Sequence, residues 1–114
     1  MKIKLLVIRT SDIHKLAGFF ILLGFQLNHH RHGNGPLHYS AVAGDAVPEI
    51  YPLAKSQTEP DRSLRLGFQI DDFATTIKLL QEKEYVFSME PMQTEFGFMA
   101  VVEDPDGRKI ELYK

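Results

Sequence analysis

The chain has 114 residues, of which 44% are hydrophobic and 25% are charged, and these are the proportions of an ordinary globular protein. Its 13 basic and 15 acidic residues nearly balance and form no basic run, so neither nucleic acid nor an anionic membrane surface is an expected partner. Cysteine is absent, which excludes disulfides, thiolate zinc sites and a cysteine nucleophile.

The hydrophobic residues form no segment that predicts a membrane span or a secretory signal. The longest apolar run, from Leu16 to Phe25, contains two glycines and falls far short of the roughly 20 residues that a spanning helix needs. Between Lys4 and Arg9 there are only four apolar residues, too few for the core of a signal peptide. We therefore expect a cytoplasmic protein with no membrane partner.

The first half of the chain is expected to run strand, helix, strand, strand, strand. Thr10, Ser11 and Asp12 carry side-chain oxygens that can cap the first turn of a helix, and Gly24 is expected to end that helix. The apolar stripe of the helix consists of Ile13, Leu16, Ala17, Phe20 and Ile21. The expected strands are 2–9, 25–32, 37–43 and 47–52, with a turn at 33–36.

Three further apolar residues of this helix, Phe19, Leu22 and Leu23, lie off the stripe. A helix that is apolar on more than one face needs cover beyond its own sheet, and a second subunit is the simplest source. This pattern predicts a homodimer.

The second half is expected to repeat the plan after a polar, proline-containing linker at 55–62. Strands are expected at 64–70, 86–93, 96–103 and 109–113, with a helix that begins near Phe73. The predicted organisation is thus a first module at 1–54 and a second module at 63–114, which together make one domain.

Two echoes in the sequence support a duplication. The tripeptide Glu49-Ile50-Tyr51 returns 62 residues later as Glu111-Leu112-Tyr113, and Asp12 returns 60 residues later as Asp72. Two units are too few for a solenoid and indicate a pseudo-symmetric fold. We expect an α+β fold in which two βαβββ modules form a curved eight-stranded mixed sheet around a cleft, with the helices outside.

Strand alternation indicates which side chains face that cleft. In the strand at 64–70 the apolar residues should face the helix, which turns Arg65 and Gln69 inward. Glu49 and Tyr51 share one strand face, and Glu111 and Tyr113 share the corresponding face of the last strand. The internal alignment pairs Leu5 with Arg65, so the cleft is expected to hold Leu5, Glu49, Arg65 and Glu111. Tyr51 and Gln69 are further candidate ligand-binding residues.

At these residues the chain resembles the vicinal oxygen chelate superfamily, which includes glyoxalase I, bleomycin resistance proteins and extradiol dioxygenases. The resemblance covers the whole chain and is strongest at the segments 11–25, 68–73 and 97–112. A glyoxalase-related subgroup is also similar at 32–39 and 49–52. The resemblance implies the fold, but this scaffold supports isomerases, lyases, dioxygenases and proteins that only bind ligands.

The resemblance also identifies four positions for metal ligands, usually His or Glu, at Leu5, Glu49, Arg65 and Glu111. Leucine cannot coordinate a metal, and arginine is a permanent cation without a free lone pair. Two carboxylates alone are a poor site for nickel, zinc or iron, so we expect no metal and no other cofactor at these positions. Arg65 is instead predicted to bridge one or both glutamates, or to clamp an anionic ligand.

The histidines present a separate choice. His29, His30, His32 and His38 lie around the turn at 33–36, and His30 and His32 share a strand face that could bind a metal. Histidines at a hairpin tip usually face solvent, and we favour that interpretation. His38 leaves the turn and is expected at the mouth of the cleft, as a hydrogen-bonding group or a general base.

The favoured function is a small-molecule binding protein of the glyoxalase/bleomycin resistance type, without the usual metal centre, acting as a homodimer on a small organic molecule. The alternative is a glyoxalase-like lyase or isomerase, or an epimerase, in which Glu49 or Glu111 is the catalytic base with a reduced or unorthodox metal site. A third possibility is a module whose partner is another protein.

Overall fold

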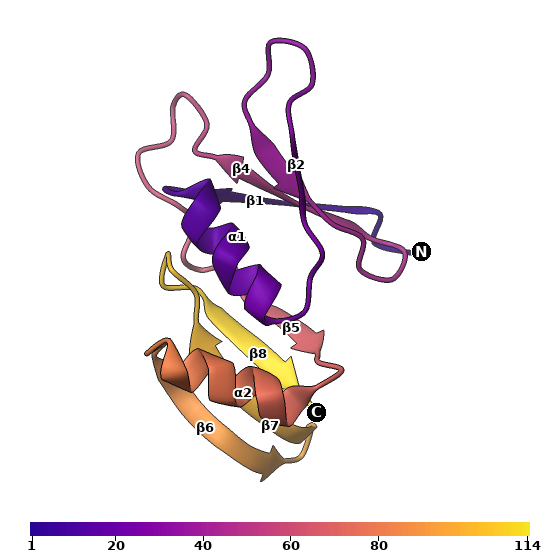
Figure 1. The fold of residues 1–114 in the computed structure, drawn as a ribbon, viewed down its shortest axis with the longest axis vertical. Coiled ribbons are helices and arrows are strands. Elements are labelled where there is room, and N and C mark those ends of the chain that lie inside the picture. Colours follow the sequence, from indigo (N-terminus) through magenta and orange to yellow (C-terminus); the bar gives the residue numbers. More distant parts are fainter. The chain divides into compact units, whose positions relative to one another are not determined.

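The computed structural model describes residues 1–114, and its elements run strand, helix and three strands, twice over (Figure 1). The first set has the bounds β1 Leu5–Thr10, α1 Ile13–Leu22, β2 Asn28–His30, β3 His38–Ser40 and β4 Val47–Pro52. The second set has the bounds β5 Leu66–Gln69, α2 Phe73–Glu82, β6 Phe87–Thr94, β7 Gly97–Glu103 and β8 Lys109–Tyr113. The α+β class and the two βαβββ modules are therefore confirmed.

The chain forms two compact units, one of Met1–Ile21 with Phe25–Pro60 and one of Leu22–Gly24 with Asp61–Lys114. The first unit contains β1 to β4 and the second contains β5 to β8, and they are called the first and the second module. The sequence predicts modules at 1–54 and 63–114, joined by a linker at 55–62, that form one domain and enclose one cleft. This organisation stays a prediction.

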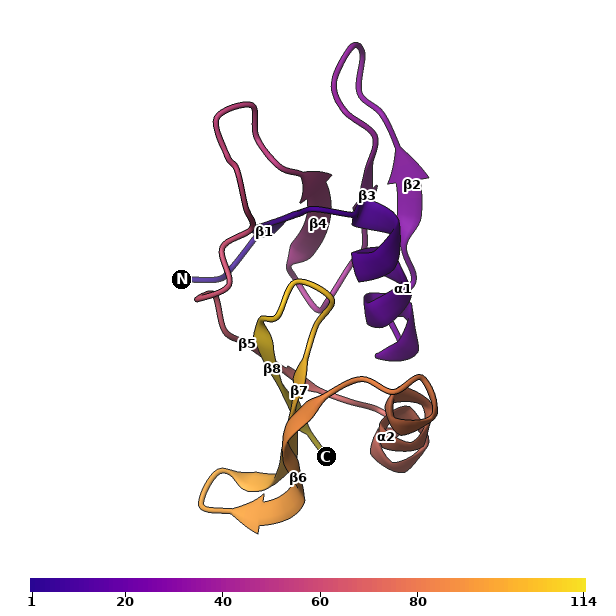
Figure 2. The same cartoon turned by 90° about the vertical axis from the view of Figure 1, so that its left-hand side faces the viewer.

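The eight strands are divided between two open four-stranded sheets, ordered β1-β4-β3-β2 and β5-β8-β7-β6. In each sheet the first strand pairs in parallel with the last, and the remaining pairs are antiparallel. Each helix covers one face of the sheet of its own module (Figure 2). The two registers are equivalent, because Val7 pairs with Glu49 in the first module and Gly67 pairs with Glu111 in the second.

The same polar contacts begin the two helices. Asp12 Oδ1 accepts hydrogen bonds from the amides of His14 and Lys15, at 3.0 and 3.1 Å. Asp72 Oδ1 accepts one from the amide of Thr75 at 3.3 Å. An aspartate side chain satisfies amides that the first turn leaves without a partner, so the capping predicted from the sequence at Asp12 is confirmed.

Several expectations for the first module need correction. The second and third strands are shorter than the expected 25–32 and 37–43, because the turn between them is wide and leaves only three residues paired on each side. Ile21, placed on the core stripe, is 54% exposed. Phe19, which was expected to need a second subunit, is fully buried within the single chain. The homodimer therefore loses part of its sequence argument and stays a prediction.

The core of the first module is tightly packed. Phe20 of α1 lies over Ile8 of β1 and Ile50 of β4, and all three side chains are at most 3% exposed. The void between them is about 10 Å³, which is room for at most one water molecule. This interior is therefore no site for an organic ligand. Each helix has ten residues, and neither is long and apolar enough to cross a membrane.

A buried ion pair organises the turn before β8. The side chains of Arg108 and Asp104 are each 1% exposed, with Arg108 Nη1 at 3.0 Å from Asp104 Oδ2. The same nitrogen lies 2.8 Å from Asp106 Oδ2, and Arg108 Nε donates to the carbonyl of Asp61 at 3.0 Å. A buried guanidinium that is satisfied in this way fixes the 104–108 turn and the start of the second module.

Candidate functional site

In the second module, Arg65, Glu111 and Tyr113 form a hydrogen-bonded group. Arg65 Nε lies 2.6 Å from Glu111 Oε2, which confirms the predicted pairing of this arginine with one of the two glutamates. The hydroxyl of Tyr113 donates to Glu111 Oε1. Both carboxylate oxygens of Glu111 are thus occupied by donors from the protein itself.

These donors hold Glu111 in its charged form. The hydrogen bond from Tyr113, and then that from Arg65, lowers the pKa of Glu111 below its usual 4.5. The same hydrogen bond raises the pKa of Tyr113 above 10.0, because the tyrosinate would lose its bond and face the carboxylate. A catalytic base works best with a pKa near the working pH, so Glu111 is poorly suited to that role.

Gly67 makes room for this group. A Cβ at Gly67 would lie only 3.3 Å from Tyr113 Cε2, so the tyrosine ring would have to move slightly, whereas the 3.6 Å to Glu111 Cβ is an ordinary contact. The first module has Val7 at the position equivalent to Gly67, and Leu5 at the position equivalent to Arg65. Gln69, a predicted ligand-binding residue, is exposed and pairs in register with Tyr113.

In the first module, Glu49 lies on the central strand β4 beside His38 of β3. His38 Nε2 is 3.7 Å from Glu49 Oε2, and the His38 ring stacks on Tyr51 with 4.2 Å between centroids and 9° between planes. The Arg9 guanidinium lies over the Tyr51 ring, 4.8 Å from its centre. The predicted site residues Glu49, Tyr51 and His38 therefore lie together.

His38, which the sequence placed at the mouth of the expected cleft, is a buried residue of β3. Its side chain is 1% exposed, and its Nδ1 lies 3.2 Å from the carbonyl oxygen of Pro36. A carbonyl only accepts, so Nδ1 carries a proton in this contact, and in the neutral tautomer with that proton Nε2 is the atom with the lone pair. This buried Nε2 has no hydrogen-bond partner.

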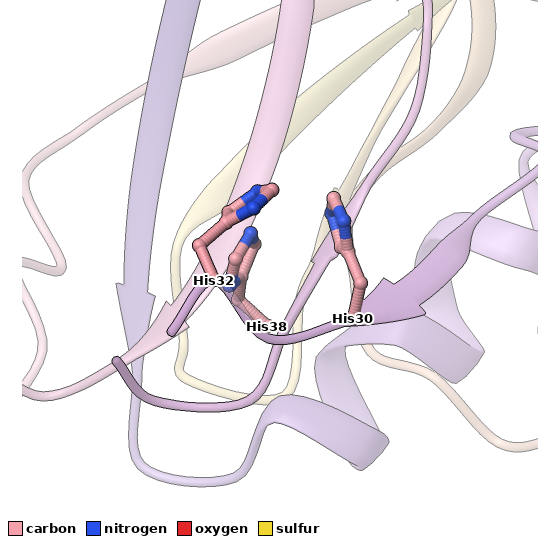
Figure 3. A group of neighbouring side chains, drawn as sticks. All are labelled: His30, His32 and His38. Atoms are coloured by element: carbon pink, nitrogen blue, oxygen red, sulfur yellow. The ribbon is translucent and has the colours of Figure 1, made fainter. Parts of the chain in front are cut away.

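His30, His32 and His38 lie together, as Figure 3 shows, and one ligating atom from each lies within 4.8 Å of the others. His30 pairs with His38 across the β2–β3 ladder, and His32 belongs to the turn that follows β2. The interpretation of His30 and His32 as solvent-facing residues of a hairpin tip is incomplete, because His32 is exposed but both rings also lie beside the buried ring of His38. The signal in the sequence was the spacing of His30 and His38 on either side of a turn, which places them opposite one another in a hairpin.

The positions that metal-using relatives employ offer a poor donor set in this chain. Leu5, 57% exposed on β1, has no lone pair, and Arg65 presents a cation that is already bound to Glu111. Glu111 has both oxygens engaged, which leaves Glu49 as the remaining donor among the four positions. A metal of the family's type does not fit these residues.

Comparison with known proteins gives a consistent family assignment. The sequence profile of the Glyoxalase/Bleomycin resistance protein/Dioxygenase superfamily matches residues 2–112. A comparison with curated protein sequences found no significant match.

Solved structures that resemble the chain include proteins with different roles. TnmS3, an antibiotic binding protein from Streptomyces sp. CB03234, is 26% identical with a TM-score of 0.78, and the match covers 99% of this chain and 94% of that one. A glyoxalase/bleomycin resistance protein from the same organism is 26% identical with a TM-score of 0.73, and the match covers 99% of this chain and 100% of that one. The oxidase ChaP-H2 shares the fold, with a TM-score of 0.78 at 15% identity, over 98% of this chain and 91% of that one. By its profile match over nearly its full length, the chain belongs to the glyoxalase/bleomycin resistance protein/dioxygenase superfamily.

Proposed function

We propose that the protein binds a small organic molecule, in the manner of the bleomycin resistance branch, without a metal at the positions that metal-using relatives employ. In this proposal it acts in the cytoplasm as a homodimer. The structural similarity to an antibiotic binding protein, at 26% identity over 99% of the chain, supports ligand binding.

The observation that carries the proposal is the state of Glu111. Its two oxygens are bound by Arg65 and Tyr113, and its pKa is lowered as a result. This arrangement removes one of the two glutamates that a metal-dependent member would use, and it leaves a carboxylate that is a weak base. It supports binding in preference to proton transfer at this position.

Arg65 is the expected anchor for the ligand. Its ion pair with Glu111 goes through Nε, and its side chain is 50% exposed, so its terminal nitrogens are available to a ligand. Guanidinium groups pair with carboxylate or phenolate oxygens through geometrically specific hydrogen bonds. We expect a ligand with an anionic or strongly accepting oxygen attached to a flat or apolar body.

A lyase, isomerase or epimerase remains the second candidate, and Glu49 is the residue that supports it. Glu49 is 18% exposed, it lies 3.7 Å from His38 Nε2, and no arginine is paired with it. A half-buried carboxylate beside an imidazole is a reasonable proton acceptor. In this alternative Glu49, and not Glu111, carries the chemistry.

A binding screen and a turnover assay on the same untagged protein test the two candidates. Thermal shift followed by calorimetry against glycopeptide and quinone antibiotics, thioester acids and α-ketoaldehyde hemithioacetals should give saturable binding in one class and no product. Arg65→Leu, which installs the residue found at the equivalent Leu5, should weaken that binding by about tenfold, the effect of losing roughly one charge-assisted hydrogen bond.

Turnover that is lost in Glu49→Gln and kept in Glu111→Gln would replace the binding proposal by the enzymatic alternative. A bound metal that is lost in Glu111→Gln would place an ion at the family's positions and overturn the proposal in a different way. No binding and no turnover across the panel would leave the protein-partner role as the better account.

A further inference from the structure

We propose that His30, His32 and His38 form a binding site for a divalent transition metal ion of the zinc type, separate from the positions that the superfamily uses. All three residues belong to the first module, on the β2–β3 hairpin and its turn. The inference therefore does not depend on the proposed function or on how the two modules pack.

The hairpin brings the three imidazoles to one place (Figure 3). His30 and His38 are opposite one another in the register of β2 and β3, with ring centroids 4.3 Å apart. The ring of His32 lies 4.8 Å from that of His30 and 5.1 Å from that of His38. Each ring thus neighbours the other two, as a three-histidine site requires.

The separations suit an ion after a small adjustment. The ligating atoms lie within 4.8 Å of one another. Zinc binds imidazole nitrogen at about 2.0–2.1 Å in tetrahedral geometry, which puts two ligand atoms about 3.3 Å apart. Closing the widest gap takes about 1.5 Å, and the exposed His32 in the turn is free to supply most of it by rotating its side chain.

The unpartnered nitrogen of His38 is a second, independent observation. Its Nε2 is buried and makes no hydrogen bond, an arrangement that costs free energy unless something binds there. Meanwhile Nδ1 is held by the carbonyl of Pro36 at 3.2 Å. Histidine ligands of metals commonly donate their other ring N–H to a backbone carbonyl, which orients the ring and selects the ligating tautomer.

Two neighbouring residues, Ser40 and Glu49, support the three histidines. Ser40 Oγ lies 2.9 Å from His30 Nε2 and holds that ring in place. The carboxylate of Glu49, 3.7 Å from His38 Nε2, supplies negative charge beside a divalent cation.

Three imidazoles favour zinc, copper, nickel or cobalt over magnesium and calcium, which prefer oxygen ligands. With three protein ligands, a tetrahedral ion keeps its fourth position open. That position would take water or an oxygen or nitrogen donor from a small molecule.

Metal titration of the untagged full chain tests the inference. Zn²⁺ is followed by calorimetry, and Co²⁺ is followed by the visible absorption bands of tetrahedral cobalt with nitrogen ligands. We expect one ion per chain with micromolar or tighter affinity. Because His32 is exposed, His32→Asn should leave the fold intact and weaken Zn²⁺ binding by at least about tenfold.

His29→Asn is the matched control. His29 is an exposed histidine of the same strand that stacks on Tyr39 and is absent from the three-histidine group, so its loss should leave Zn²⁺ affinity unchanged. Glu111→Gln should also leave it unchanged. Equal affinity in wild type and His32→Asn, or no binding at micromolar Zn²⁺, would overturn the inference. Binding that survives His32→Asn and is lost in Glu111→Gln would place the ion at the family's positions instead.

Discussion

Glu84 takes the same place after α2 that Gly24 takes after α1: each follows its helix with a positive φ, 63° at Glu84 and 106° at Gly24. Directly after each, an amide bonds back to the helix, from Phe25 to Phe20 at 3.1 Å and from Tyr85 to Leu80 at 3.0 Å. This backbone conformation suits glycine, whereas a side chain brings Cβ close to a carbonyl oxygen and costs about 1 kcal/mol.

Glu84→Gly should therefore stabilise the protein slightly, by up to about 0.6 kcal/mol, because the greater flexibility of glycine in the unfolded chain offsets about 0.4–1 kcal/mol of the relieved strain. Urea denaturation measures the change in the free energy of unfolding. The matched control is Gly24→Ala, which should destabilise by about 1 kcal/mol. No atom lies within 4 Å of a Cβ built at Gly24, so the control reports backbone strain alone. Destabilisation by Glu84→Gly would contradict this account.

Removing Arg108 should be the most damaging single change to the second module. Arg108→Met leaves Asp104, whose side chain is 1% exposed, as a buried charge without its cation, which costs about 3–5 kcal/mol. The midpoint of urea unfolding should fall accordingly. Asp104→Asn combined with Arg108→Met removes the stranded charge and should recover part of the loss. A single variant as stable as the wild type would show that the ion pair contributes little.

The Glu111–Tyr113 hydrogen bond predicts a dependence of stability on pH at both extremes. The pKa of Glu111 is lowered, so its contribution is complete above pH 4.5 and is lost as the pH falls through the folded-state value below 4.5. The pKa of Tyr113 is raised, so its contribution is complete below pH 10.0 and is lost as the pH rises through the folded-state value above 10.0. Tyr113→Phe should flatten both limbs of the stability profile.

Ultraviolet titration of tyrosinate checks the alkaline limb. Glu111→Gln should lower the pKa of Tyr113 toward 10.0, whereas Arg65→Leu should raise it further, because the Arg65 cation favours the tyrosinate. Tyr85→Phe is the control, since the pKa of Tyr85 is raised by burial and by Asp104 and not by Glu111. The same pKa for Tyr113 in wild type and Glu111→Gln would show that the hydrogen bond is absent in solution.

Arg65→Leu should separate ligand binding from stability. The Arg65 and Glu111 side chains are 50% and 22% exposed, so their ion pair contributes at most about 1 kcal/mol to folding. Thermal unfolding of the variant should therefore stay close to that of the wild type, while affinity for an acidic ligand falls by about tenfold. A large loss of stability with unchanged affinity would show that Arg65 stabilises the fold and does not bind the ligand.

Features that follow from local side-chain chemistry or from the repeated sequence pattern were predictable. The Asp12 cap, the module order and the equivalence of Glu49 with Glu111 follow from side-chain chemistry and a repeated pattern, and the structure has all three. A pairing of Arg65 with one or both glutamates was also predicted, because a carboxylate needs a compensating charge and an arginine stood at the position of a ligand, and the structure shows that the partner is Glu111.

The histidine group was missed because it depends on the width of a turn. The expected strand at 25–32 placed His30 and His32 on one face, with no third residue fixed near them. The strand ends instead at His30, and the turn folds His32 back toward His38. Arg108 was missed for a similar reason, since its contact with the carbonyl of Asp61 joins segments 47 residues apart.

The strand order has a further consequence for where variation is tolerated. Glu49 and Glu111 stand on β4 and β8, which are hydrogen-bonded to a neighbour on either side. Leu5 begins β1 and Arg65 directly precedes β5, and these outer strands are held on one side only. A central strand that is hydrogen-bonded on both sides holds its side chains in fixed positions. An edge strand tolerates a change of residue type at a smaller cost in stability. The fold therefore holds Glu49 and Glu111 in place on central strands, while the positions of Leu5 and Arg65 at the edge strands can change. Ligand preference can change at these edge positions while the two sheets stay the same.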